Sequence, residues 1–445
     1  MAMALCSASS CSAAFLDVVF LSSVGGSKGA LGTNTFLFSI RLTTACRRGS
    51  SSSFFSLRRK VTFRAELKEG DSSEITDEML PGRWDVVGLG QAMVDFSGLV
   101  EDQFLENLHL EKGIRKIVNH EERGKVLSAL SGHSFKASAG GSLSNTLVAL
   151  ARLGSAGNLH PKLRVAMTGS VGSDPLGHFY RAKLLKANVQ FLSPPIVDGT
   201  TGTVIVLTTP DAQRTMFSYA GMSSVVKFDA TLAESISAAR MLVIEGYLWE
   251  LPKTVEAIAE ACETAYKSGI VVALTASDVS CIKRHRKQFW DLMRARADIV
   301  FTNSNEARAL CDLNEDASAQ LAACMLSQQC PFVSVTDGAN GSYIGVAGQV
   351  TYISPAPCMP VDTCGAGDAY AAGILYGILK GVSNVKGMGN LAARVAAVVV
   401  GQQGTRLKQT DASCLVESFF ASSIATGEKP LDETHLCAAV EVDTI

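Results

Sequence analysis

Residues 362–368 read Asp-Thr-Cys-Gly-Ala-Gly-Asp, and an almost wholly apolar run follows over residues 369–379. The run predicts a buried helix, which Lys380-Gly381 would end. A Gly-Ala-Gly turn therefore precedes a helix N-terminus, where unpaired backbone N–H groups and the helix dipole attract anions. Asp368 would lie in the first helical turn, either as a base that takes a proton from a hydroxyl or only as a helix-start acid.

Upstream of this stretch, strand and helix signals alternate along the chain. Short apolar runs between turn residues predict strands at 85–90, 164–167, 241–244, 271–274, 298–301 and 332–335. Helical patterns occur at 144–153, 176–186, 252–267, 286–296, 306–313, 317–328, 368–380 and 391–400. Such alternation predicts an α/β domain over residues 83–415, with a mainly parallel sheet flanked by helices.

Two stretches interrupt this alternation. Residues 96–137 insert a polar, partly helical segment after the first strand, and residues 200–220 predict a hairpin around Pro210-Asp211.

The motif at 362–368 resembles the C-terminal signature of the ribokinase-like (pfkB) carbohydrate kinases, and the resemblance extends over roughly residues 83–410. Within that family the chain is most similar to a plastid pfkB-type protein of plants. The resemblance implies a three-layer fold in which the segments near 96–137 and 200–220 form a small β lid. It also implies ATP-dependent phosphorylation of a hydroxyl on a small molecule, with Mg²⁺.

The first strand ends in a motif that excludes a dinucleotide site. Gly88 and Gly90 begin a G-x-G, but the third glycine of the dinucleotide motif would fall at Met93, and no P-loop motif is present. In the pfkB family an Asp at the position of Asp95 binds acceptor hydroxyls, a task that suits a carboxylate because it accepts two hydrogen bonds. The alternative is that Asp95 only ends a strand.

A second motif, residues 139–145, precedes the helix predicted to end near Leu153. It resembles the family's N-terminal signature, which implies that Gly140 and Gly141 allow close approach of the acceptor and that Asn145 binds it. The alternative is a helix start with Ser144 as its cap.

Two further motifs follow later strands. Asn303 and Glu306 resemble the family's Asn-x-x-Glu, which implies that Glu306 orders Mg²⁺ through water and that both residues lie at the ATP phosphates. The alternative is a helix cap with an acid in the first turn. Thr336 and Gly338 resemble the family's ATP-phosphate loop.

For the motif at 362–368, the resemblance implies that Asp368 is the catalytic base. The backbone N–H groups of Gly365, Ala366 and Gly367 would stabilise the charge on the transferred phosphoryl group. Residues 401–406 correspond to a loop that holds a monovalent cation in many family members, and the positions compatible with K⁺ are Asp362, Thr363 and Gly404.

The first 64 residues differ in composition from the rest of the chain. They hold thirteen Ser, eight Lys or Arg and a single acid, which is typical of an organelle transit peptide. We expect targeting to the chloroplast stroma, with the mitochondrion as the alternative. Residues 65–82 read as a linker, and residues 416–445 form a tail without a clear pattern, consistent with disorder.

Charge and cysteine content exclude several functions. The chain has 40 Lys and Arg against 42 Asp and Glu, and the basic excess of residues 1–64 leaves the remainder acidic, which disfavours nucleic-acid binding. No segment is long and apolar enough to predict a membrane span. The twelve Cys include no C-x-x-C pair and predict neither a disulfide framework nor a zinc site. Cys364 could serve a redox role, because helix N-termini lower thiol pKa values.

These observations leave two functions open. The first is a phosphotransferase that acts on a ribose-like sugar or a nucleoside. The second is a catalytically weak or inactive pfkB-type protein that acts as a binding or regulatory factor in plastid gene expression or photosynthetic complex accumulation. An exposed edge strand of the lid would also allow a homodimer.

Overall fold

The computed structural model describes residues 83–130, 134–156, 161–211, 213–251, 254–382 and 384–425, together with four strand segments nearer the chain ends. These four segments form a separate antiparallel sheet of β1 (Leu16–Leu21), β2 (Thr35–Leu42), β3 (Val61–Glu66) and β18 (Ala439–Glu441). The rest of the predicted targeting segment and linker, and the end of the predicted tail, lie outside the described residues.

A nine-stranded sheet forms the middle layer of the domain, with the order β17-β16-β15-β14-β13-β12-β4-β8-β9. From β15 to β9 all neighbouring strands are parallel, and β16 and β17 add an antiparallel edge. The bounds are β4 (Trp84–Leu89), β8 (Val165–Thr168), β9 (Val189–Phe191), β12 (Ala239–Glu245), β13 (Val271–Thr275), β14 (Ile299–Asn303), β15 (Phe332–Thr336), β16 (Ser342–Val346) and β17 (Gln349–Ile353). The six predicted strands are all present. The sequence prediction lacks β9, β16 and β17, which lie at the two edges of the sheet and contain exposed or partly exposed positions.

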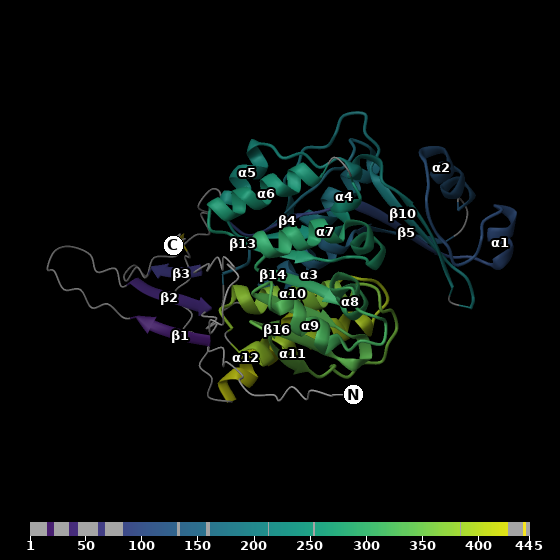
Figure 1. Ribbon diagram of the computed structural model, residues 1–445. Helices are drawn as coiled ribbons and strands as arrows, with labels where there is room; N and C mark the ends of the chain where they lie inside the picture. Colours follow the sequence, from purple (N-terminus) through teal and green to yellow (C-terminus); the bar gives the residue numbers. More distant parts are fainter. Residues whose placement is uncertain are drawn as a thin grey trace, which may run out of the picture.

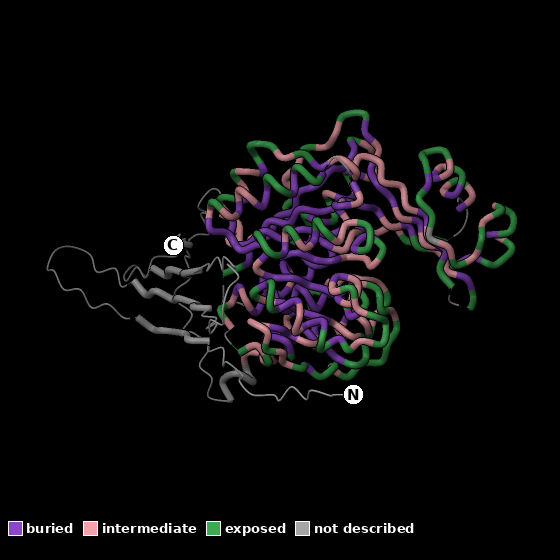
Figure 2. Tube along the Cα trace, viewed as in Figure 1, coloured by how far each residue is buried: buried purple, intermediate pink, exposed green. Residues whose placement is uncertain are grey.

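Helices cover both faces of this sheet, because successive residues of each strand point to opposite sides. In β12, Met241 and Val243 belong to one buried cluster, and Leu242 and Ile244 belong to the other. Figures 1 and 2 show the buried strands between the two helical layers. The first layer contains α3 (Ser142–Gly154), α4 (Pro175–Leu185), α10 (Ala366–Leu379), α11 (Val385–Val400) and α12 (Gln409–Ala425). The second contains α5 (Ala230–Ser237), α6 (Val255–Lys267), α7 (Val279–Ala295), α8 (Ser304–Cys311) and α9 (Ala319–Ser327).

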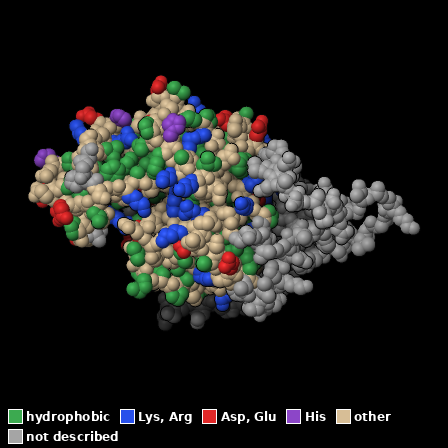
Figure 3. Space-filling model, turned by 180° about the vertical axis from the view of Figure 1, so that it is seen from behind, with side chains coloured by type: hydrophobic (Ala, Val, Ile, Leu, Met, Phe, Trp, Pro, Cys, Tyr) green, Lys and Arg blue, Asp and Glu red, His purple; other side chains and the backbone are tan. Residues whose placement is uncertain are grey.

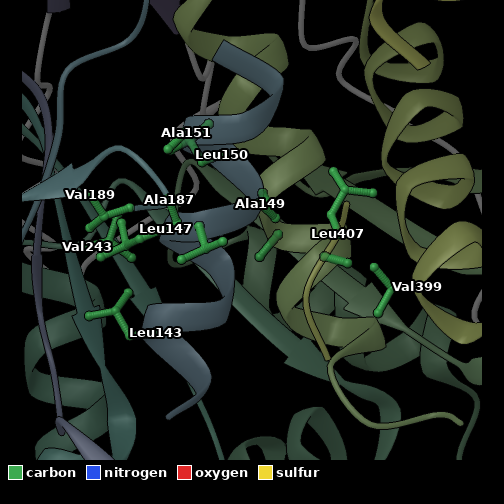
Figure 4. Close-up of a cluster of buried hydrophobic side chains, with 14 of the residues drawn as sticks. Leu143, Leu147, Ala149, Leu150, Ala151, Ala187, Val189, Val243, Val399 and Leu407 are labelled. Atoms are coloured by element: carbon green, nitrogen blue, oxygen red, sulfur yellow. The ribbon is translucent and has the colours of Figure 1, made fainter. Parts of the chain in front are cut away.

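Helix α3 packs between the sheet and the helices of its own layer. Leu143 and Leu147 lie near Val243 of the sheet, and Ala149 lies on the side of Leu407 (Figure 4). This packing fixes the N-terminus of α3 at the carboxyl end of the sheet, beside the N-terminus of α10. Both predicted glycine-led helix starts therefore lie at the same edge.

Four helices of the two layers differ from the sequence prediction. The prediction lacks α5, Ala230–Ser237. Helix α7 begins at Val279 rather than residue 286, and a non-helical His285 marks the point where the prediction starts. Helix α11 begins at Val385 rather than residue 391, because Asn384 caps it and Gly389 packs against Ile353. Helix α12 was not predicted, and it extends past the boundary placed at residue 415, so the first ten residues of the predicted tail are helical.

A second sheet, of order β6-β11-β10-β5-β7, extends from the body of the domain (Figure 1). It consists of β5 (Met93–Leu99), β6 (Arg115–Ile117), β7 (Phe135–Gly140), β10 (Gly202–Thr208) and β11 (Arg214–Tyr219). One face carries buried side chains such as Phe96, Leu207 and Phe217, next to α1 (Asp102–Asn107) and α2 (His120–Ala129). The other face is partly exposed. This sheet is the predicted lid, built from both predicted segments.

The described surface carries charges of both signs. Lys and Arg side chains gather near the middle of the face seen from behind, and acidic side chains lie around its margins (Figure 3). Among the described residues, no helix is long and apolar enough to cross a membrane.

Candidate active site

Asp368 lies in the first turn of α10, as the sequence predicts. Gly365 is the residue before the helix and has a φ of 81°, a conformation that favours glycine. The Ala366 amide donates to the Thr363 carbonyl oxygen at 3.3 Å, so this one of the three predicted anion-binding amides turns back into its own loop. Among the described residues, the amides of Gly365 and Gly367 have no such acceptor, and they remain for an incoming anion.

The Asp368 carboxylate is held by two side chains of α3. Ser142 Oγ donates to Oδ1 at 2.6 Å, and Asn145 Nδ2 donates to Oδ2 at 3.0 Å. Burial raises the pKa of Asp368 to about 6, although both hydrogen bonds oppose the rise. Asn145, predicted to bind the acceptor, therefore also holds Asp368 in place, and its Oδ1 accepts a further bond from Thr405.

Asp95 comes to the same place from lid strand β5. The position that a Cβ would take at Gly140 lies only 2.0 Å from Asp95 Oδ2, so the missing side chain of Gly140 makes room for the carboxylate. Burial raises the pKa of Asp95 to about 7, the Arg406 guanidinium opposes the rise, and the negative charge of Asp368 adds to it. Asp95, Gly140, Asn145 and Asp368, predicted from distant motifs, therefore form one cluster.

Gly141 shapes the turn into α3. Its φ is 92°, and a Cβ there would lie 2.7 Å from the Gln91 carbonyl oxygen, so only glycine fits. Arg406 also reaches this turn, where its Nη2 donates to Ser144 Oγ at 3.2 Å. The site thus joins the lid, α3 and the loop that follows α11.

Glu245 is a site residue that the sequence analysis missed. It ends β12 with 1% of its surface exposed, and its oxygens accept from the Gln91 amide at 2.6 Å and the Leu143 amide at 3.2 Å. Burial raises its pKa to about 7. The only signal in the sequence is a charged residue directly after the apolar run of β12. Glu245 fixes the loop before Asp95 to the start of α3.

We expect Glu245→Gln to loosen this junction, because the amide NH₂ cannot accept a hydrogen bond from a backbone N–H. One buried donor would lose its partner, and the free energy of unfolding should fall by about 1–3 kcal/mol. The acceptor KM should rise more than kcat falls. Urea denaturation and steady-state kinetics measure both effects.

Glu250→Gln is the matched control, since Glu250 is partly exposed and pairs with Arg284 and His285, and its change should alter stability by less than about 1 kcal/mol. A Glu245→Gln protein with wild-type stability and acceptor KM would remove Glu245 from this positioning role.

Asp368 also lines a pocket, together with polar groups at the ends of the parallel strands. Its volume is about 650 Å³, open to solvent. The lining residues are Ser142, Thr146, Thr275, Ser277, Phe301, Thr302, Asn303, Glu306, Ser334, Thr336, Gly367, Asp368, Tyr370 and Ala371. We call residues 362–367 the anion loop. A Cβ at Gly367 would meet no atom within 4 Å, so this part of the anion loop is open to a ligand. Gly338, predicted at the ATP phosphates, is not among the lining residues.

Asn303 and Glu306 form a capping box at the start of α8. The Asn303 side chain accepts from the Glu306 amide, and the Glu306 carboxylate accepts from the Asn303 amide, each at 2.9 Å. The cap geometry considered from the sequence is therefore present, but both residues also line the pocket. Burial raises the pKa of Glu306 to about 7, and no ion pair to it occurs in the described part of the chain. A buried carboxylate without a cationic partner fits a site for hydrated Mg²⁺.

The loop that leads to Gly365 contains two of the three predicted potassium ligands, Asp362 and Thr363. The amides of Val361 and Asp362 donate to the Val400 carbonyl oxygen, so this loop lies against the end of α11. Asp362 Oδ1, however, is 3.1 Å from Arg214 Nη2 of the lid, and a guanidinium therefore already neutralises the carboxylate. This arrangement does not fit a K⁺ ion at Asp362.

Cys364 differs from the expectation of a lowered thiol pKa. Partial burial of the sulfur is the main cause that raises the pKa of this thiol, and the negative charge of the neighbouring Asp362 carboxylate raises it further. Its Sγ accepts a hydrogen bond from Arg214 Nη1 at 2.7 Å. The helix N-terminus therefore does not activate Cys364 as a thiolate.

Comparison with known proteins identifies the family. The model of the pfkB family of carbohydrate kinases matches residues 87–412, a segment that contains every site residue described above. The chain belongs to this family. Its predicted ribokinase-like fold and its class, a phosphotransferase with a hydroxyl acceptor, are thereby confirmed.

Relatives within the pfkB family act on sugars or nucleosides. A nucleoside kinase of Methanothermobacter thermautotrophicus is 29% identical over 289 residues, which cover 63% of this chain and 84% of that protein. A ribokinase of Bacillus subtilis is 26% identical over 297 residues, which cover 65% and 91%. Among solved structures, an adenosine kinase of Sinorhizobium meliloti is 30% identical with a TM-score of 0.65, and the match covers 76% of this chain and all of that one.

Proposed function

We propose that this pfkB-family protein transfers the γ-phosphoryl group of ATP to a hydroxyl of a small sugar or nucleoside. The observation that carries the proposal is the position of Asp368. Its carboxylate lines the pocket that Asn303 and Glu306 also line, its negative charge acts on the buried Asp95 carboxylate of the lid, and the residues of the anion loop immediately precede it in the chain. A base between an acceptor site and a phosphate site is the arrangement that phosphoryl transfer to an alcohol needs.

The residues of the chain divide the chemistry as follows. Asp95 accepts hydrogen bonds from acceptor hydroxyls and holds one of them near Asp368. Asp368 takes the proton of that hydroxyl as its oxygen attacks phosphorus. The amides of Gly365 and Gly367 donate to the phosphoryl oxygens on which charge develops. When bound through water at Glu306, Mg²⁺ would supply charge neutralisation for the phosphates.

Support for either acceptor class comes from the relatives, whose names include both a ribokinase and nucleoside or adenosine kinases. The test is ATP consumption by protein that starts near Glu66, with Mg²⁺, across a panel of sugars and nucleosides. Turnover with one acceptor would establish the reaction and name the substrate. Measurable ATP binding without turnover on any acceptor would contradict the proposal and favour the regulatory alternative.

We also propose that the protein acts in the chloroplast stroma. The support is compositional: residues 1–64 are rich in Ser, Lys and Arg and contain a single acid. Import of a fluorescent fusion that carries residues 1–64 would test this location. A homodimer through the lid is a further proposal, supported by the edge position of β6, where Ile117 is 84% exposed.

The activity should depend on pH through Asp368. A base works only when it is ionised, so the contribution of Asp368 should be complete well above its pKa of about 6 and fall as the pH drops through that value. Asp95 and Glu306, with pKa values of about 7, would lose charge in the same direction, so the decline should begin near pH 7. We expect kcat/KM for the acceptor to fall by at least about tenfold per pH unit at the acid end. A flat profile from pH 8 to pH 5 would contradict Asp368 as the base.

A further inference from the structure

Arg214 joins the lid to the anion loop. It begins β11, where it pairs with Thr208 of β10, and Thr208 in turn pairs with Leu99 of β5. Because residues two apart share a face of a strand, Arg214 lies on the same partly exposed face of the lid as Asp95. The face of the lid that carries Asp95 therefore also carries Arg214, which bonds to the body.

The guanidinium of Arg214 is shared between two groups of the body. Nη2 lies 3.1 Å from Asp362 Oδ1, and Nη1 donates to Cys364 Sγ at 2.7 Å. The same Asp362 oxygen accepts from the Cys364 amide at 3.0 Å and so holds the turn that leads to Gly365. A cation at Asp362 therefore contacts the same oxygen that holds the turn before Gly365.

We propose that Arg214 does at Asp362 what a bound monovalent cation would do, so that closure of the lid, rather than K⁺, organises the anion loop. The inference rests on the proposed phosphotransferase function. Asp362 carries one negative charge, and the guanidinium already neutralises it, so a second cation beside it would be repelled by like charge.

A second lid cation faces the other predicted potassium position. The site that a Cβ would take at Gly404 lies 3.7 Å from the Nζ of Lys136, which belongs to lid strand β7. Lys136 pairs with Ser97 of β5 and therefore shares the face of Asp95 and Arg214. The lid thus presents a positive charge to each of the two loops, around Asp362 and around Gly404, between which K⁺ was expected.

The pairing of Arg214 with Asp362 is suited to a lid that must also open. The two side chains are 41% and 19% exposed, and ion pairs of this kind are weak because water competes for both partners. The lid can therefore release substrates and products and re-form the contact on closing, which would couple the state of the anion loop to the presence of an acceptor.

The test compares wild type with Arg214→Gln and Arg214→Lys, first in choline chloride and then in 100 mM KCl. Wild-type turnover should change less than about twofold between the two salts. The turnover of Arg214→Gln in choline should fall by about threefold to fivefold, the scale of one partly exposed ion pair, and K⁺ should restore part of the loss. Arg214→Lys keeps a cation, so its turnover in choline should lie between that of wild type and that of Arg214→Gln.

A readout independent of activity is amide hydrogen exchange of residues 362–367 without nucleotide. Exchange there should be faster in Arg214→Gln and should slow again with K⁺, while wild type should not respond to K⁺. Lys116→Gln is the control, because Lys116 is a lid cation whose ion pair among the described residues is with Glu122, and the variant should behave as wild type.

Wild-type turnover that rises more than tenfold with K⁺ would overturn the inference. So would an Arg214→Gln protein whose exchange matches wild type in both salts. If no acceptor is phosphorylated, the proposed function fails, but the exchange experiment still decides whether Arg214 holds the loop.

Discussion

Asp368→Asn should bind ATP nearly as well as wild type and should lose turnover by at least about 10²–10⁴-fold, the usual effect of removing a positioned base. The side chain keeps its size, and its carbonyl oxygen can still accept from Ser142 or Asn145, so the fold should persist. What disappears is the capacity to take a proton. ATP affinity by calorimetry and kcat with the identified acceptor measure the two effects separately.

Asp411→Asn is the matched control, since Asp411 is also an acid in the first turn of a helix, α12, but lies outside the site. If Asp368 were only a helix-start acid, the two variants would behave alike. Turnover of Asp368→Asn within about threefold of wild type would remove it from the role of base, because a factor of three is less than 1 kcal/mol in the barrier.

The position of Asp368 could be predicted because its cause is local. Three small residues, one acid and an apolar run specify a helix start within a few positions of one another. The residues that tune Asp368 are not local: Ser142 and Asn145 bind it across 226 and 223 residues of sequence. Sequence could indicate that the N-terminus of α3 belongs to the site, but not that Asn145 would be turned toward Asp368.

Glu245, Arg214 and Arg406 illustrate what a single sequence does not reveal. Glu245 and Arg214 have no motif around them, Arg406 ends the segment 401–406, and each acquires its role only when distant segments meet. Glu245 accepts bonds from residues 154 and 102 positions away. Arg214 reaches Asp362 across 148 positions. Such residues become visible only once the lid and the sheet are placed in space.

The predicted helix at 391–400 starts too late, because α11 begins at Val385. Gly387 and Gly389 lie in its first turns although glycine has a low intrinsic helix propensity. A Cβ at Gly389 would lie 2.5 Å from Cδ1 of Ile353, so glycine is required there by the close approach of the helix to the sheet. Tertiary packing outweighed the local cost, and that packing was not readable from the sequence.

Gly140→Ala should cost about 10²-fold in kcat/KM for the acceptor, because misplacing a substrate-binding group by about 1 Å has an effect of this order. The new Cβ would lie 2.0–2.2 Å from the atoms of the Asp95 carboxylate, so the carboxylate must move. The loss should appear mainly in the acceptor KM, with ATP affinity unchanged. Gly124→Ala in lid helix α2 is the control, since a Cβ there meets no atom within 4 Å.

A double-mutant cycle shows whether Gly140 acts through Asp95. In an Asp95→Ala protein the carboxylate is gone, so the Cβ of Gly140→Ala has room. Adding Gly140→Ala to Asp95→Ala should therefore lower kcat/KM for the acceptor by less than about a further threefold. Contacting residues are expected to be non-additive in this way, whereas independent effects would multiply. A full 10²-fold loss on top of Asp95→Ala would mean that Gly140 contacts the acceptor directly, and the space beside Asp95 would then serve the substrate rather than the carboxylate.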